Sequence, residues 1–148
     1  MELSELIERS KQYGMWAHVA TVSESGRPYV TPVHPCWDGD RLVAMVGTDS
    51  TKARNVAANP NVSVHWQVGE STNFDSFIVW GDAVVRDDID TKRRLWEGVF
   101  DYDLGEFAPG GPDDSPTTGF LEITPTKILW LGQFGMAGRE TWTARSGG

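Results

Sequence analysis

The feature that most constrains the fold is a succession of short apolar segments, each bounded by residues that favour turns. Within residues 61–68, for example, Val62, Val64 and Trp66 alternate with polar residues, which is the pattern of a half-buried strand. Strand-like segments occur at residues 15–22, 29–37, 41–46, 61–68, 76–86, 120–124 and 127–131. This succession favours a mainly β protein over a helical one.

Helical periodicity is confined to three short stretches. Leu3, Leu6 and Ile7 share one face of an N-terminal helix that ends near Gly14. Two further helices are predicted at residues 51–58, capped by Asp49 or Ser50, and after Asp88, where Ile89, Lys92, Leu95, Trp96 and Val99 recur at helical spacing. Antiparallel connections with helices outside predict a β-barrel of six to seven mostly antiparallel strands with two to three short outer helices.

Proline and glycine positions refine the strand predictions. Pro32 and Pro35 fall in the segment at residues 29–37, so this strand should lie at an edge, bend, or remain unpaired on one side. Gly81 allows a bend or bulge in residues 76–86, and Pro125 separates the last two predicted strands.

The chain is predicted to form one domain at residues 1–131, followed by a partly flexible tail at residues 132–148 with Trp142 as its anchor. Residues 102–118 are rich in Gly, Pro and Asp and form a long loop, a length at which loops are often functional.

Charge and hydropathy exclude several classes of partner. The net charge of −8 argues against binding to nucleic acid or to an anionic membrane. No apolar run approaches the roughly 18 residues of a membrane span, and the first ten residues lack the basic start of a signal peptide. We therefore expect a soluble, cytoplasmic protein.

Metal and nucleophile signals are weak in the sequence. His18, His34 and His65 fall on three different predicted strands with no Asp or Glu at ligand spacing, so no metal site is predicted. Cys36, the single cysteine, has His34 two residues away, but a half-buried thiol is favoured over a nucleophilic pair. Neither a Rossmann fingerprint nor a P-loop is present.

The most informative stretch is residues 47–55, where a strand is followed by Gly47, small hydroxyl residues and then Lys52 in the first turn of a helix. Amides of a helix N-terminus, hydroxyls and a lysine together favour an anion-binding site. A basic residue here opposes the helix dipole, which supports that interpretation. The alternative is a capped helix with solvated basic residues.

The order and spacing of several short motifs resemble the pyridoxamine 5'-phosphate oxidase-like FMN-binding split barrels, in particular their general stress protein branch. The resemblance covers about residues 3–131. The motifs that carry it lie at residues 20–22, 26–28, 32–33, 37–40, 50–54, 59–62, 79–83, 109–114, 120–123 and 128–130.

The resemblance implies a split β-barrel that forms a homodimer, with one FMN in each of two grooves at the interface. It places the phosphate on Thr51 and Lys52 with Ser50 close by, and Ser76 near a polar contact. It places Val30, Thr31, Pro32 and Val33 beside the isoalloxazine and ribityl chain, and Met45 and Val46 on the groove floor. Residues 107–112 are expected at the groove mouth, and Trp66 and Trp80 in an exposed apolar face that a dimer would cover.

The implied activity is that of a flavin-dependent oxidoreductase acting on an unidentified small molecule, with no catalytic residue assigned. Val30 and Pro35 stand where the oxidase has basic residues, which argues against oxidation of pyridoxamine phosphate itself. Two alternatives remain open: an F420-dependent reductase of the sister branch, and a non-catalytic protein that holds a flavin or a tetrapyrrole.

Overall fold

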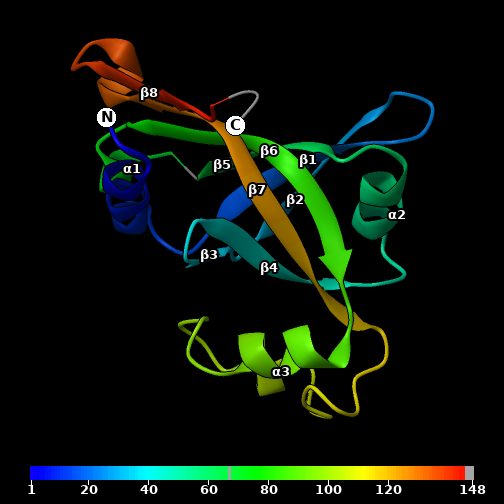
Figure 1. Cartoon of the computed structure of the whole chain (residues 1–148). Coiled ribbons are helices and arrows are strands. Elements are labelled where there is room, and N and C mark those ends of the chain that lie inside the picture. Colours follow the sequence, from blue (N-terminus) through cyan, green and yellow to red (C-terminus); the bar gives the residue numbers. More distant parts are fainter. Residues whose placement is uncertain (67, 146–148) are drawn as a thin grey trace.

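A computed structural model describes residues 1–66 and 68–145, and within them the protein is one antiparallel sheet of eight strands with three short α-helices (Figure 1). The strands are β1 (Ala17–Val22), β2 (Pro28–Val33), β3 (Cys36–Asp38), β4 (Arg41–Gly47), β5 (Asn61–Trp66), β6 (Ser76–Arg86), β7 (Thr118–Leu131) and β8 (Arg139–Thr143). The helices are α1 (Leu3–Ser10), α2 (Thr51–Ala58) and α3 (Ile89–Trp96). None of the helices in the described residues is long and apolar enough to cross a membrane.

The strand order is β2-β1-β5-β6-β7-β4-β3, with β8 added to β7, and the sheet is not closed. The two edge strands β2 and β3 are nevertheless consecutive in sequence, with only His34 and Pro35 between them. Three residue steps span at most about 11 Å, so the two edges must come close to each other. The sheet is therefore rolled like a barrel but split between β2 and β3, which confirms the predicted fold class.

The single strand predicted at residues 29–37 is wrong, because the structure divides this segment between two edges of the sheet. Pro35 lies in the break, where a residue without an N–H loses no ladder hydrogen bond. The expected edge position is confirmed for both strands of this segment, β2 and β3.

The two strands predicted around Pro125 are in fact one fourteen-residue strand, β7. The register between β6 and β7 shifts at Trp80/Gly81, opposite Pro125. Pairing with β4 ends at Ile123 and pairing with β8 begins at Lys127, so Pro125 lies between two partners on that side of β7. The bulge predicted at Gly81 is thus confirmed, and it allows a proline within a long strand.

The segment after β7 contains a strand that sequence patterning missed. Residues Gly132–Gly135 form a 3-10 turn, and Arg139–Thr143 pair with β7 as β8. Trp142, the predicted anchor, packs against the core. Of the tail predicted at residues 132–148, residues 146–148 lie outside the described residues, as does residue 67 of the strand predicted at 61–68.

The main hydrophobic core fills the inside of the rolled sheet, and a smaller cluster lies under α3 around Leu95, Leu104 and Phe120. Trp66 belongs to the main core, with 4% of its surface exposed and its ring edge-on to Phe77 at 5.3 Å. The expectation that Trp66 helps to form an exposed apolar face is therefore wrong.

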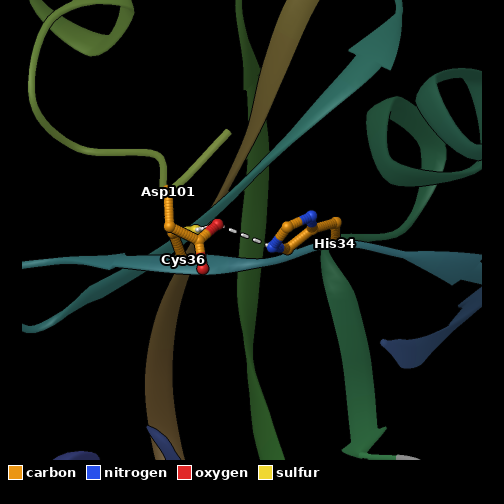
Figure 2. Close-up of side chains that lie close together, drawn as sticks. All are labelled: His34, Cys36 and Asp101. Atoms are coloured by element: carbon orange, nitrogen blue, oxygen red, sulfur yellow. Dashed lines mark hydrogen bonds and ion pairs between the residues drawn. The ribbon is translucent and has the colours of Figure 1, made fainter. Parts of the chain in front are cut away.

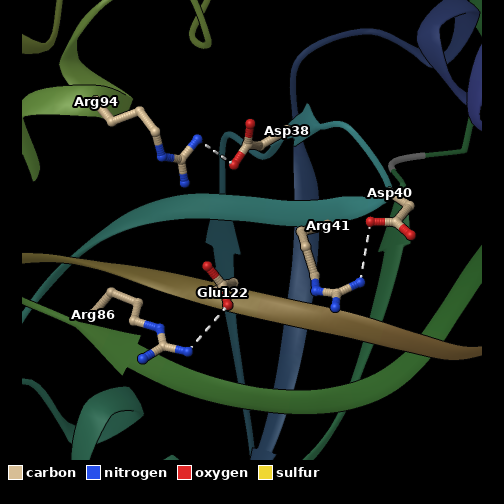
Figure 3. A network of polar contacts seen from close by, with 6 residues as sticks. All are labelled: Asp38, Asp40, Arg41, Arg86, Arg94 and Glu122. Carbon is tan, nitrogen blue, oxygen red and sulfur yellow. Dashed lines mark hydrogen bonds and ion pairs between the residues drawn. The ribbon is translucent and has the colours of Figure 1, made fainter. Parts of the chain in front are cut away.

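Polar contacts attach α3 to the sheet and to the long loop that follows it. Arg94 Nη1 lies 2.8 Å from Asp38 Oδ2, joining α3 to the end of β3 (Figure 3). The buried Lys92 donates from Nζ to the backbone oxygen of Ser115 at 2.7 Å. The exposed ion pairs add little stability, but together these contacts fix the loop at residues 102–117 against one end of the sheet.

Candidate functional site

A groove of about 630 Å³ lies between β2, β4, the start of α2 and the long loop. Part of its apolar surface is supplied by β2 and β4 through Pro32, Val33, Met45 and Val46. The remaining lining residues are Met15, Trp16, His34, Gly47, Asp49, Lys52, Asp101, Tyr102, Glu106, Phe107, Thr117 and Thr118. An apolar cleft of this size with a few polar groups is typical of a small-molecule or cofactor site.

Among the described residues, Lys52 is the one Lys or Arg whose side chain lines this groove. Its Nζ donates a hydrogen bond of 2.8 Å to Thr31 Oγ1, which links α2 to β2. Burial lowers the pKa of Lys52. Among the described residues no carboxylate lies within 4.0 Å of this Nζ. A half-buried ammonium without a counter-ion is arranged to receive an anion.

The N-terminus of α2 adds donors beside Lys52. Ser50 is the cap, since its Oγ accepts from the Ala53 amide at 3.2 Å. The first two amides of the helix, at Thr51 and Lys52, have no acceptor within the helix. Arg54 folds back over this turn, donating to the backbone oxygen of Asp49 at 2.6 Å and to Thr51 Oγ1 at 3.1 Å. The arrangement favours the anion site over a merely solvated lysine.

The structure brings together most of the site residues named from sequence. Pro32, Val33, Met45, Val46 and Lys52 line the groove, and Thr31 contacts Lys52 directly. Ser50 and Thr51 form the adjacent helix turn without lining the groove. Val30 projects from the edge strand with 60% of its surface exposed, and Ser76 lies opposite Leu131 at the start of β6, outside the lining.

An aromatic wall on the groove was not found from sequence. The His34 ring stacks on Tyr102 with centroids 4.3 Å apart and tilts toward Trp16 at 5.8 Å, and Tyr102 meets Phe107 edge-on. Burial raises the pKa of Tyr102 to about 12, so its hydroxyl stays protonated near neutral pH. The long loop was the available signal: of residues 107–112, which were expected at the groove mouth, Phe107 lines the groove and the others do not. Nothing local pointed to Tyr102 or Trp16.

The structure places a carboxylate beside one histidine, although no Asp or Glu stands at ligand spacing from the histidines in the sequence. Asp101 Oδ1 lies 2.8 Å from His34 Nε2, and Cys36 Sγ is 3.7 Å from the same oxygen (Figure 2). Burial raises the pKa of Cys36 to about 11, so the thiol is not an activated nucleophile. His18 and His65 are neighbours across β1 and β5 and are not members of this cluster.

Comparisons with known proteins agree with this architecture. The sequence matches the pyridoxamine 5'-phosphate oxidase family over residues 4–131. The fold is similar to that of a protein from Clostridium acetobutylicum related to general stress protein 26, with a TM-score of 0.75, 18% identity and coverage of 97% of this chain and 96% of that one. No curated protein sequence matches the chain.

Two further solved structures share the fold. One is a pyridoxamine 5'-phosphate oxidase-related, FMN-binding protein from Nostoc punctiforme, with a TM-score of 0.67, 18% identity and coverage of 97% and 95% of the two chains. The other is an F420 reductase, with a TM-score of 0.59, 24% identity and coverage of 77% of this chain and 88% of that one.

Proposed function

Because the chain belongs to the pyridoxamine 5'-phosphate oxidase family, we propose that it is a flavin-dependent oxidoreductase that binds FMN in the groove. The observation that carries this proposal is Lys52, a half-buried ammonium held by Thr31 at the N-terminus of α2 and facing an apolar groove. FMN combines the two features that this site accepts, a phosphate and a flat apolar ring system.

Each part of the groove has a role toward the cofactor. Lys52 and the free amides of the first turn of α2 would hold the phosphate. Met45, Val46 and Val33 would support the ring and exclude water from one side of it. When bound, FMN supplies the redox chemistry, while this chain positions the ring and shapes the space in which a substrate can approach it.

The charge of the groove limits the class of substrate. Asp49, Asp101 and Glu106 line it together with the single lysine, and the phosphate of FMN would occupy that lysine. A second phosphate, such as that of pyridoxamine phosphate, would then lie near these carboxylates. Among the described residues that line the groove, no other Lys or Arg is present to neutralise it. We therefore propose an uncharged or cationic small molecule as the substrate. The same charge balance favours FMN over F420, which carries additional carboxylates.

The proposed assembly is a homodimer with the cofactor at the interface. Apolar side chains beside the groove are unusually open to solvent in the single chain, including Trp16 at 49%, Val30 at 60% and Phe107 at 68% exposure. A second copy would cover these side chains and close the groove. Light scattering at micromolar concentration should give about twice the chain mass of 16.4 kDa, whereas a monomer with FMN bound would contradict the interfacial site.

Titration of the purified protein with FMN and with F420, followed by flavin fluorescence and absorbance, tests the cofactor. We expect FMN to bind at one molecule per chain and more tightly than F420. Tighter binding of F420 would move the protein to the alternative reductase function, and a Soret band with no flavin affinity would favour tetrapyrrole binding.

Stopped-flow kinetics then tests turnover. The FMN-loaded protein, reduced under anaerobic conditions, is mixed with quinone, nitroaromatic and other uncharged acceptors. We expect at least one acceptor to reoxidise the bound flavin faster than it reoxidises free reduced FMN. If every acceptor reacts more slowly with the bound flavin, the protein stores its cofactor without turnover.

A further inference from the structure

Three side chains able to ligate a metal lie close together (Figure 2), between the groove proposed to bind FMN, called the flavin groove below, and a second cavity. His34 lies in the link between β2 and β3, Cys36 begins β3, and Asp101 belongs to the segment after α3. One ligand atom from each lies within 4.8 Å of the others. We propose that His34, Cys36 and Asp101 bind a divalent cation of the zinc class, with a fourth position left for water or a small molecule.

The donor types select this class of ion. Imidazole nitrogen, thiolate sulfur and carboxylate oxygen are all ligands of Zn²⁺, whereas Mg²⁺ and Ca²⁺ take oxygen ligands. Three protein ligands around a four-coordinate ion leave one position unfilled, as in zinc sites that bind a water or a substrate. The net charge of −8 also favours cations over anions around the molecule.

Two of the three ligand pairs lie close to the spacing that an ion requires, and all three ligand atoms lie within 4.8 Å of one another. Bond lengths of about 2.0–2.3 Å at tetrahedral angles place neighbouring ligand atoms about 3.4–3.6 Å apart. The 3.7 Å between Cys36 Sγ and Asp101 Oδ1 already approaches this value. The 2.8 Å between His34 Nε2 and Asp101 Oδ1 is the length of a hydrogen bond, and it must widen by about 0.6 Å to fit that tetrahedral spacing.

The side chain that must move away from His34 is the one free to do so. Asp101 is 70% exposed, whereas the His34 side chain is 13% exposed and its ring is flanked by Tyr102 and Trp16. The backbone of Cys36 is held by its pairing with Val43 of β4. As the metal binds, the imidazole of His34 gives up the Nε2 proton that it shares with Asp101 and keeps one hydrogen on Nδ1, which frees the Nε2 lone pair for the metal. The Cys36 thiol releases its proton to solvent as the sulfur–metal bond forms.

The position of the cluster gives the ion access to small molecules. His34 and Asp101 line both the flavin groove and a neighbouring cavity of about 330 Å³, which Cys36 also lines. An ion held here could take its fourth ligand from either space. The metal site does not depend on flavin binding, so it stands or fails independently of the proposed oxidoreductase function.

Cobalt spectroscopy on the full chain, without flavin, tests the site. We expect Co²⁺ to bind at one ion per chain, with the visible bands of a tetrahedral ion and an ultraviolet charge-transfer band from the thiolate. Zn²⁺ should displace it. Cys36→Ser should remove the thiolate band and weaken binding at least about tenfold, while Asp101→Asn should weaken binding but keep the thiolate band.

The matched control is the double variant His18→Gln/His65→Gln, because these neighbouring histidines could bind an ion by themselves. Its cobalt spectrum and affinity should equal those of the wild type. A wild-type spectrum without the thiolate band, or loss of binding in the control variant, would overturn the proposal. The test does not depend on whether Cys36→Ser folds. The wild-type spectrum needs no variant, and Asp101→Asn changes an exposed side chain that the fold should tolerate.

Discussion

Replacing Lys52 by Ala separates phosphate recognition from the rest of cofactor binding. In the proposed complex Lys52 makes a charge-assisted contact with the phosphate, worth about 1.5–3 kcal/mol. Its loss should weaken FMN binding roughly 10- to 150-fold, since each 1.4 kcal/mol is a factor of ten. Riboflavin has the same ring without the phosphate, so its affinity should be nearly the same for wild type and variant.

The fold should tolerate this substitution. The variant loses the hydrogen bond to Thr31, but it also removes an ammonium that burial disfavours. These effects oppose each other, and the free energy of unfolding without ligand should change by less than about 1 kcal/mol. Urea denaturation measures this directly.

Fluorescence titration with both flavins measures the two affinities side by side. Lys127→Ala is the matched control, because it removes the same charge from β7, where the lysine lies over the Trp80 ring. It should leave both affinities unchanged. Equal losses for FMN and riboflavin in Lys52→Ala would refute the phosphate contact, as would no loss for either ligand.

Three further predictions concern stability. Gly81→Ala should destabilise the protein by about 1–3 kcal/mol in urea denaturation, because the added Cβ would lie 2.4 Å from the backbone oxygen of Thr124. The control is Gly69→Ala, whose added Cβ meets nothing within 4 Å and should leave the stability unchanged. Equal stabilities of the two variants would disprove the tight bulge. Asn55→Ala should cost about 1–3 kcal/mol, since it leaves the buried Thr21 hydroxyl without the 3.0 Å bond from Asn55 Nδ2, and adding Thr21→Val should recover part of that loss. Because the folded-state pKa of Lys52 is lowered from 10.5, the unfolded chain holds that proton more tightly. The stability of ligand-free wild type relative to Lys52→Met should therefore rise with pH between the lowered pKa and 10.5; a fall in that window would contradict the burial of the ammonium.

Local sequence patterns predicted most elements of the fold, and the errors have physical causes. Alternation and capping located β5, β6 and all three helices, because those signals lie within the elements themselves. The break at Pro35 and the continuity of β7 through Pro125 depend instead on which strands pair on each side. β8 was missed because a short polar segment becomes a strand through its pairing with β7.

The candidate site shows the same division. The anion-binding end was predicted because its donors lie within one helix turn around Lys52. The cluster of His34, Cys36 and Asp101 could not be predicted, because the carboxylate is 65 positions from the cysteine in the chain. Sequence spacing carries no information about a contact that the segment after α3 makes with β3.

A crystal structure of the protein with FMN tests the central claim most directly. We predict the phosphate within hydrogen-bonding distance of Lys52 Nζ and the first amides of α2, and the isoalloxazine ring over Met45 and Val46. We also predict that a second copy covers Trp16 and Val30. A flavin bound elsewhere, or one whose phosphate makes no contact with Lys52, would contradict the account.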